Sequence, residues 1–205
     1  MSPVRHNSTL RMTQLAILTA IVGVLSYFGG FIKIGGLASI SLTLVPVVLG
    51  AALLGPRAGA WLGAVSGAVF FLTADAAFWL NLSVFGTILT VMVKGTLAGL
   101  AAGLLYRLFA KRNMLLALLT AAAVCPIVNT GIFLLGCLTF FFDAVKEMAG
   151  AADSSVFAVL LVVFVGLNFV FELLLNLLLT PALQRIITAI APKKKGSAPL
   201  PPKAV

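Results

Sequence analysis

The chain has 205 residues, of which 61% are hydrophobic and only 9% are charged, and its mean hydropathy is +1.18. Soluble domains carry about a quarter charged residues, so a soluble fold could not bury this much apolar surface. The formal net charge of +9 comes from basic residues scattered through loops. Without a basic stripe and interleaved aromatics, nucleic-acid binding is disfavoured. Composition therefore predicts an integral membrane protein whose solvent is the lipid bilayer.

Six apolar runs, bounded by charges, Gly-Pro turns and polar clusters, are predicted to span the membrane as helices. They cover residues 12–32, 41–55, 57–74, 84–106, 114–142 and 155–182. The second is short, and Gly55-Pro56-Arg57 turns the chain into the third, which indicates a close helical hairpin. The predicted fold is an all-α bundle over residues 1–191, followed by a disordered basic tail over 192–205.

The basic residues fix the expected orientation, because cytoplasmic loops are enriched in Lys and Arg. With six spans, both termini lie on one side, and that side holds eleven of the fourteen basic residues. The other side holds Lys33 and Lys146 together with four of the five acidic residues. Both termini should therefore be cytoplasmic.

Small residues recur every fourth position on three of the predicted helices. The third span carries Gly59, Gly63 and Gly67, and the fourth carries Gly95, Gly99 and Gly103. Such faces let helix backbones approach closely in lipid, so we interpret them as packing surfaces. Ala16 and Ala20 form a smaller version in the first span, where the pattern fits either internal packing or a docking surface.

Four polar residues are predicted to share one depth near the middle of the membrane. They lie on three different spans: Lys94, Asn129, Asn168 and Glu172. Asn168 and Glu172 are four residues apart and therefore share a helix face, which Asn176 extends by one turn. Because a charge at the bilayer centre costs at least ~2.5–3.5 kcal/mol, such residues indicate a functional site by default. This cluster is a candidate binding site for a small solute.

The alternative for the same residues is a buried Lys94–Glu172 ion pair, with the asparagine amides bridging helices and no ligand involved. A catalytic site is not indicated, because the lone His6 sits in a polar terminus and no Ser/His/Asp set shares a depth. The sequence also has no Cys/His spacing typical of a metal site, and we interpret Cys125 and Cys137 as apolar packing residues. We expect neither an enzyme nor a bound cofactor or metal.

Several segments resemble the substrate-binding S components of energy-coupling factor (ECF) vitamin transporters. The most specific is LTLVPVVLGAALLGPRAGAWLGAVSGAVFFL (42–72), which resembles that family's proline-containing second helix, Gly-Pro-basic turn and glycine-rich third helix. Similar matches are VKGTLAGLAAGLLYRLF (93–109), VNTGIFLLG (128–136), NFVFE (168–172) and AILTA (16–20), the last resembling the Ala-x-x-x-Ala motif of helix one. The family often has Pro-Arg and Pro-Glu where this chain has Val93-Lys94 and Phe171-Glu172, which leaves the substrate open.

The resemblance implies a multi-pass protein of a prokaryotic plasma membrane that binds a vitamin from outside. It also implies a separate membrane coupling subunit (EcfT-like) and two cytoplasmic ATPases as partners, since this chain lacks a P-loop of its own. The family motif assigns docking on the coupling subunit to Ala16 and Ala20. It assigns the substrate pocket to the four midplane residues named above.

Two vitamins are the nearest substrate types that the resemblance suggests. Pantothenate is a small flexible anion whose carboxylate suits Lys94 and whose hydroxyls and amide suit Asn129, Asn168 and Glu172. Riboflavin needs a flat aromatic slot, which the Phe residues could line, but no Trp or Tyr is placed in the pocket by sequence. We therefore favour pantothenate. A stand-alone secondary transporter or channel is the competing function, although its expected inverted repeats do not extend to a second half of the chain.

Overall fold

The computed structural model describes residues 3–29 and 42–190, and within these it describes the side chains of 9–29, 42–162 and 169–190. Every element in these ranges is helical. In chain order they are α1 (Pro3–Gly29), α2 (Leu44–Leu54), α3 (Pro56–Phe70), α4 (Ala74–Leu82), α5 (Val84–Phe109), α6 (Met114–Thr139), α7 (Phe142–Ala151), α8 (Val156–Val159), the π-helical turn η1 (Leu160–Val165) and α9 (Gly166–Ile190). The predicted tail at 192–205 lies outside the described residues.

Four of the described helices are long and apolar enough to cross a membrane, namely Thr9–Gly29, α5, α6 and Phe169–Ile190. A fifth candidate is the pair α3 and α4, which is bent by 84° at its break. The remaining predicted span contains α2, whose eleven residues reach only about 16 Å at 1.5 Å per residue. The structure thus supports an all-helical protein with four to five candidate spans.

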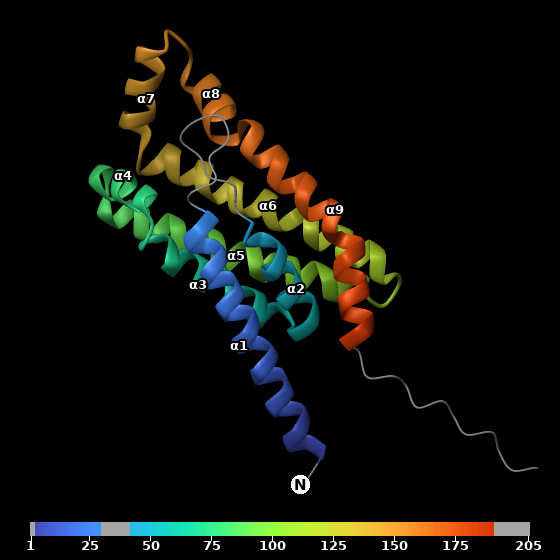
Figure 1. Cartoon of the computed structure of the whole chain (residues 1–205). Helices are drawn as coiled ribbons and strands as arrows, with labels where there is room; N and C mark the ends of the chain where they lie inside the picture. The colour runs from blue at the N-terminus through green and yellow to red at the C-terminus, as the bar shows by residue number, and fades with distance from the viewer. Residues whose placement is uncertain (1–2, 30–41, 191–205) are drawn as a thin grey trace, which may run out of the picture.

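Two short helices were not predicted as separate elements. Ser83 begins α5 by accepting a hydrogen bond on its side chain from the Gly86 backbone N–H at 3.1 Å, which separates α5 from α4. The second, α7, occupies the loop predicted after the fifth span. Figure 1 shows α4 and α7 at the end of the bundle opposite to the first turns of α1 and the last turns of α9. Both ends of the described chain therefore lie at one end of the molecule.

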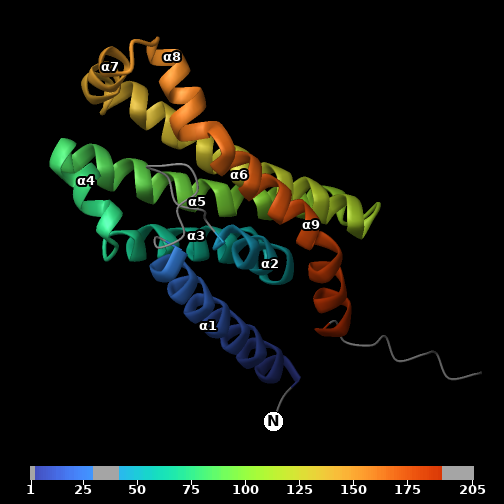
Figure 2. The same cartoon turned by 45° about the horizontal axis from the view of Figure 1, so that its top comes forward.

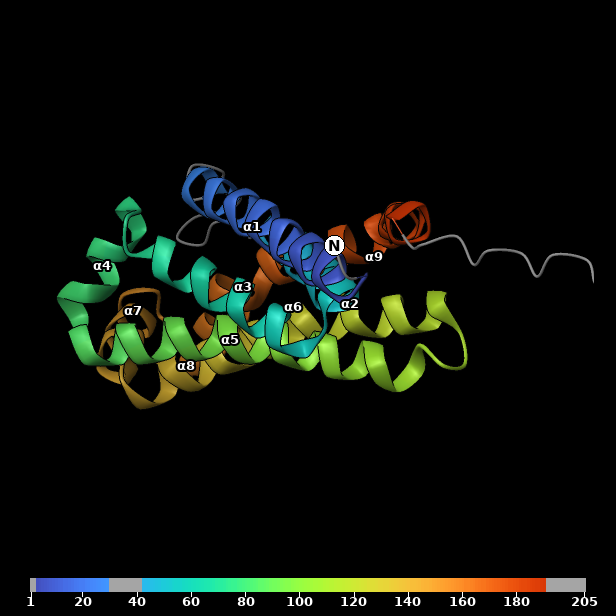
Figure 3. The same ribbon diagram turned by 90° about the horizontal axis from the view of Figure 1, so that it is seen from below.

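The helices pack in layers around α3 and α5, which make the most extensive contact in the described chain. Figures 2 and 3 show α1 lying against α2 and α3, on the side away from α5 and α6. On the far side, α6 packs between α5 and α9. Arg11 ties the start of α1 to the end of α2, because its Nη2 donates a hydrogen bond to the Leu54 carbonyl at 3.4 Å.

The predicted glycine packing faces are confirmed. A Cβ atom added at Gly63 would collide with the Gly95 carbonyl, and one added at Gly59 would collide with the Gly99 carbonyl. Gly67 faces the Val91 carbonyl, at 3.0 Å from the position of such a Cβ. Side chains at these positions would push α3 and α5 apart, so the glycines set the distance between the two helices.

Both cysteines are free and buried, as expected for packing residues. Cys125 of α6 belongs to the larger core cluster, together with Val22 of α1, Val48 of α2 and Leu62 of α3. Cys137 belongs to a second cluster around Trp79, near the end that carries α4 and α7. The space between these two cores is where the candidate site lies.

Candidate functional site

A pocket opens at the end of the bundle opposite to the described termini. Its walls come from α1, α2, α3, the start of α4, α5 and α6, and it encloses about 650 Å³ when the part open to solvent is included. The side chains that can form hydrogen bonds in its lining are Ser26, Thr43, Ser66, Thr73, Asp75, Lys94 and Asn129. Small-molecule sites commonly combine an apolar wall with a few convergent polar groups, so this is the candidate binding site.

Lys94 supplies the pocket's positive charge from α5. Its Nζ lies 5.0 Å from the centroid of the Phe133 ring and 5.9 Å from that of Phe70. Among the described residues, no hydrogen bond or ion pair within 4.0 Å reaches this ammonium. Ring faces attract cations through their quadrupole, at about 0.5–2 kcal/mol per contact. The two rings thus stabilise the charge in part and leave its hydrogen-bonding protons available to a ligand.

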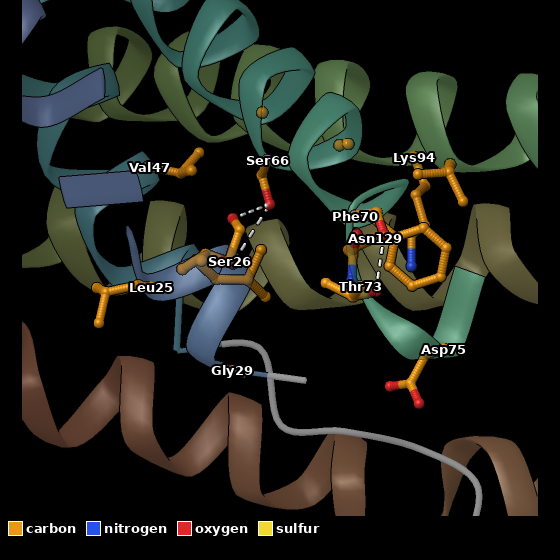
Figure 4. Close-up of a pocket in the computed structure, with 16 residues that line it drawn as sticks. Leu25, Ser26, Gly29, Val47, Ser66, Phe70, Thr73, Asp75, Lys94 and Asn129 are labelled. Atoms are coloured by element: carbon orange, nitrogen blue, oxygen red, sulfur yellow. Dashed lines mark hydrogen bonds between the residues drawn. The ribbon is translucent and has the colours of Figure 1, made fainter. Parts of the chain in front are cut away.

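Asn129 lies beside Lys94 on the neighbouring helix α6, where it is 8% exposed. Figure 4 shows Lys94, Phe70 and Asn129 gathered on one side of the pocket, and Ser26 and Ser66 on the other. An amide both donates and accepts hydrogen bonds, whereas an ammonium only donates. Together the two side chains can bind a carboxylate and a neighbouring hydroxyl or amide.

Glu172 is buried on α9 but is not among the pocket's lining residues. Its charge attracts that of Lys94. One turn along the helix, the Asn176 Nδ2 donates a hydrogen bond to the Glu172 carbonyl at 2.8 Å. The Asn168 side chain lies outside the described residues. The structure therefore brings Lys94 and Asn129 together in the pocket and places Glu172 within electrostatic reach, behind the wall.

Four hydroxyl side chains of the pocket, those of Ser26, Thr43, Ser66 and Thr73, were missed from the sequence. The Ser26 hydroxyl donates to Ser66 Oγ at 3.0 Å, and the Ser66 hydroxyl donates to Thr43 Oγ1 at 3.4 Å. This chain joins α1, α3 and the start of α2. Isolated serines and threonines are common in membrane helices, where they form hydrogen bonds between helices, so their presence in the sequence did not indicate a pocket. Asp75 was missed for a different reason, because it was counted as a loop charge.

Ala16 and Ala20 lie on the outward face of α1. Both are exposed, whereas Leu18 and Val22 on the opposite face are buried. The two alanines therefore do not pack inside this chain. An exposed pair of small residues leaves room for another helix to approach closely.

Residues 10–184 match a family model described as "ECF transporter, substrate-specific component". No curated protein and no solved structure matched the chain. The family match covers most of the sequence and includes every residue placed in the pocket above.

Proposed function

Because this chain belongs to the substrate-specific components of ECF transporters, we propose that its pocket captures a water-soluble vitamin, with pantothenate as the favoured ligand. Members of this family are multi-pass membrane subunits that bind a small molecule and are not themselves enzymes. The family also implies association with a membrane coupling subunit and ATPases. The resemblance inferred from sequence is therefore confirmed, whereas the choice of vitamin is our proposal.

The observation that carries the proposal is the Lys94 ammonium, which lines the pocket without an ion-pair partner within 4.0 Å among the described residues. A bare charge in a membrane protein is costly, and a bound carboxylate would supply a charge-assisted hydrogen bond. Asn129 can both donate and accept hydrogen bonds to the amide and hydroxyl groups of pantothenate. The Ser26 and Ser66 oxygens, whose protons are used in the chain to Thr43, can still accept from the ligand. The proposal also includes Asn168 and Glu172, which would complete the site from α9.

Riboflavin remains the second candidate. Phe70 is the one aromatic ring among the described lining residues of the pocket, and Trp79 lines a neighbouring cavity instead. A flat tricyclic ring gains most from several aromatic contacts, and the described lining supplies one, so the lining favours the smaller anion. The family match favours a subunit of an ATP-driven importer over the stand-alone transporter or channel.

We further propose that the chain crosses the plasma membrane six times with both termini in the cytoplasm. The distribution of basic residues supports this orientation. The pocket lies at the end away from Pro3 and Ile190, so it would open to the outside, where the vitamin is captured. The exposed face of Ala16 and Ala20 would then dock on the coupling subunit.

Calorimetric titration of the purified protein in lipid nanodiscs with pantothenate and riboflavin tests the substrate. Pantothenate should bind in a one-to-one complex, and β-alanine, which keeps only its carboxylate end, should bind far more weakly. Saturable riboflavin binding without pantothenate binding would overturn the choice of ligand. Affinity purification from cells that express all subunits should bring down the two ATPases, and their absence would contradict the proposed assembly.

A further inference from the structure

A second cavity lies next to the pocket, toward the end that carries α4 and α7. It encloses about 300 Å³ when its open part is included, and it shares Phe70 and Val91 with the pocket as a common wall. The rest of this aromatic chamber is formed by Trp79, Thr87, Thr90, Phe133 and Phe141. The Phe133 ring lines this chamber and also contacts the Lys94 ammonium of the pocket. The chamber therefore begins one ring away from the charge of the site.

The rings of the chamber are arranged as a corner and not as a slot. Trp79 packs edge to face on Phe133, at 5.2 Å between centroids and 84°, and on Phe141 at 5.1 Å and 65°. A planar ligand stacks best along an open, extended ring face. A corner of crossed rings instead surrounds a compact, branched aliphatic group on several sides. The ring geometry thus favours a ligand group that is compact and branched as well as apolar.

One hydroxyl in the chamber wall lacks a partner. Thr90 is 4% exposed, and its Oγ1 makes no hydrogen bond within the described chain. Thr87, one turn earlier, differs in that its hydroxyl is within 2.7 Å of both the Trp79 and the Ser83 carbonyls. A buried hydroxyl without a partner has lost its hydrogen bonds to water and regains them when a ligand hydroxyl reaches it.

We propose that the aromatic chamber is a second compartment of the substrate site and receives a compact branched aliphatic group that bears a hydroxyl. This inference rests on the proposed function, in which Lys94 holds the anionic end of the ligand. Pantothenate carries such a group at the end remote from its carboxylate, where a carbon with two methyl groups stands between two carbons that bear hydroxyls. The methyl groups contact the crossed rings, and one hydroxyl pairs with Thr90.

The chamber can be probed without the whole vitamin, because the chain has two tryptophans and only Trp79 lies in the chamber. In the Trp61→Phe variant, Trp79 is the single fluorescent reporter, and Trp61 is an exposed residue of α3. We expect 2,2-dimethylpropane-1,3-diol to change the Trp79 emission saturably in nanodiscs. Propane-1,3-diol, which lacks the two methyl groups, should bind at least tenfold more weakly.

Thr90→Val in the same background removes the hydroxyl and keeps the shape, so it should weaken the branched diol about fivefold to tenfold. Thr96→Val is the matched control on the same helix, since the Thr96 hydroxyl donates to the Met92 carbonyl at 2.7 Å and lines neither cavity. It should leave diol binding unchanged. Unaltered melting temperatures would show that both variants fold.

The outcomes separate the two proposals. Equal binding of both diols, no change in Trp79 emission, or equal effects of Thr90→Val and Thr96→Val would overturn the chamber proposal. If pantothenate binds to the protein and loses no affinity when its two methyl groups are replaced by hydrogens, the chamber proposal fails and the proposed function stands. If the branched diol binds as expected and pantothenate does not, the chamber stands and the choice of vitamin fails.

Discussion

Replacing Lys94 with methionine tests the anion site most directly. The variant keeps the length of the side chain and removes its charge, and a thioether still packs favourably against the Phe70 and Phe133 rings. A charge-assisted hydrogen bond contributes about 1.5–3 kcal/mol. Since each ~1.4 kcal/mol is a factor of ten, Lys94→Met should weaken pantothenate binding by roughly one to two orders of magnitude. Glu172→Gln should have a smaller effect, because an amide still accepts hydrogen bonds and the residue lies outside the pocket lining.

Without ligand, the Lys94→Met change should not destabilise the protein. Among the described residues the ammonium has ring contacts but no hydrogen bond to replace its lost hydration, and Glu172 attracts it only from outside the pocket lining. Removing the charge should therefore leave the melting temperature unchanged or raise it. The pantothenate-induced rise in melting temperature should shrink in the same variant. The ion-pair alternative predicts another pattern. In that case either single change lowers the melting temperature, and the double variant Lys94→Met/Glu172→Gln recovers it with binding unaffected.

Melting temperatures with and without ligand, together with calorimetric titrations of the two single variants and the double, decide between these patterns. Lys94→Arg is the matched control, because it keeps the charge and should retain more affinity than the methionine variant. A well-folded Lys94→Met protein that binds pantothenate with wild-type affinity would refute the anion-site reasoning.

Three further predictions concern packing, docking and orientation. Gly63→Ala should lower the melting temperature, since the new Cβ would collide with the Gly95 carbonyl and overpacking costs roughly 1–3 kcal/mol. Gly23→Ala should leave the melting temperature unchanged, because its Cβ would meet nothing within 4 Å. Equal effects of the two changes would contradict the glycine-face interpretation. Ala16→Leu or Ala20→Leu should weaken copurification of the coupling subunit and leave vitamin binding intact, because a larger side chain there blocks close helix approach. The control is Ala77→Leu, at an exposed position of α4 at the other end of the bundle. Loss of vitamin binding in the α1 variants would instead indicate that the alanines pack inside this chain. A cysteine placed in the 143–153 segment should react with a membrane-impermeant reagent in intact cells, against little background from the buried Cys125 and Cys137. Labelling from the cytoplasmic side alone would contradict the proposed orientation.

The sequence by itself determined the membrane class, the main helical segments, the glycine packing faces of α3 and α5 and the family. These properties depend on local quantities, namely the hydropathy of a run and the spacing of small residues along it. Lys94 could be singled out for the same reason, because a charge within an apolar run is costly at any rotation of the helix. Asn129 was found in the same way, as an amide in an apolar run.

The tertiary structure decided which side chains share the pocket. Ser26 lies on α1, Ser66 on α3 and Thr43 just before α2, yet the three join in one hydrogen-bonded chain. Phe70 of α3 and Phe133 of α6 both lie against one ammonium. A serine or a phenylalanine is tolerated on any face of a membrane helix, so hydropathy gives no information about its direction. The 84° bend between α3 and α4, on which Trp79 lies, was likewise not indicated by the hydropathy of these runs.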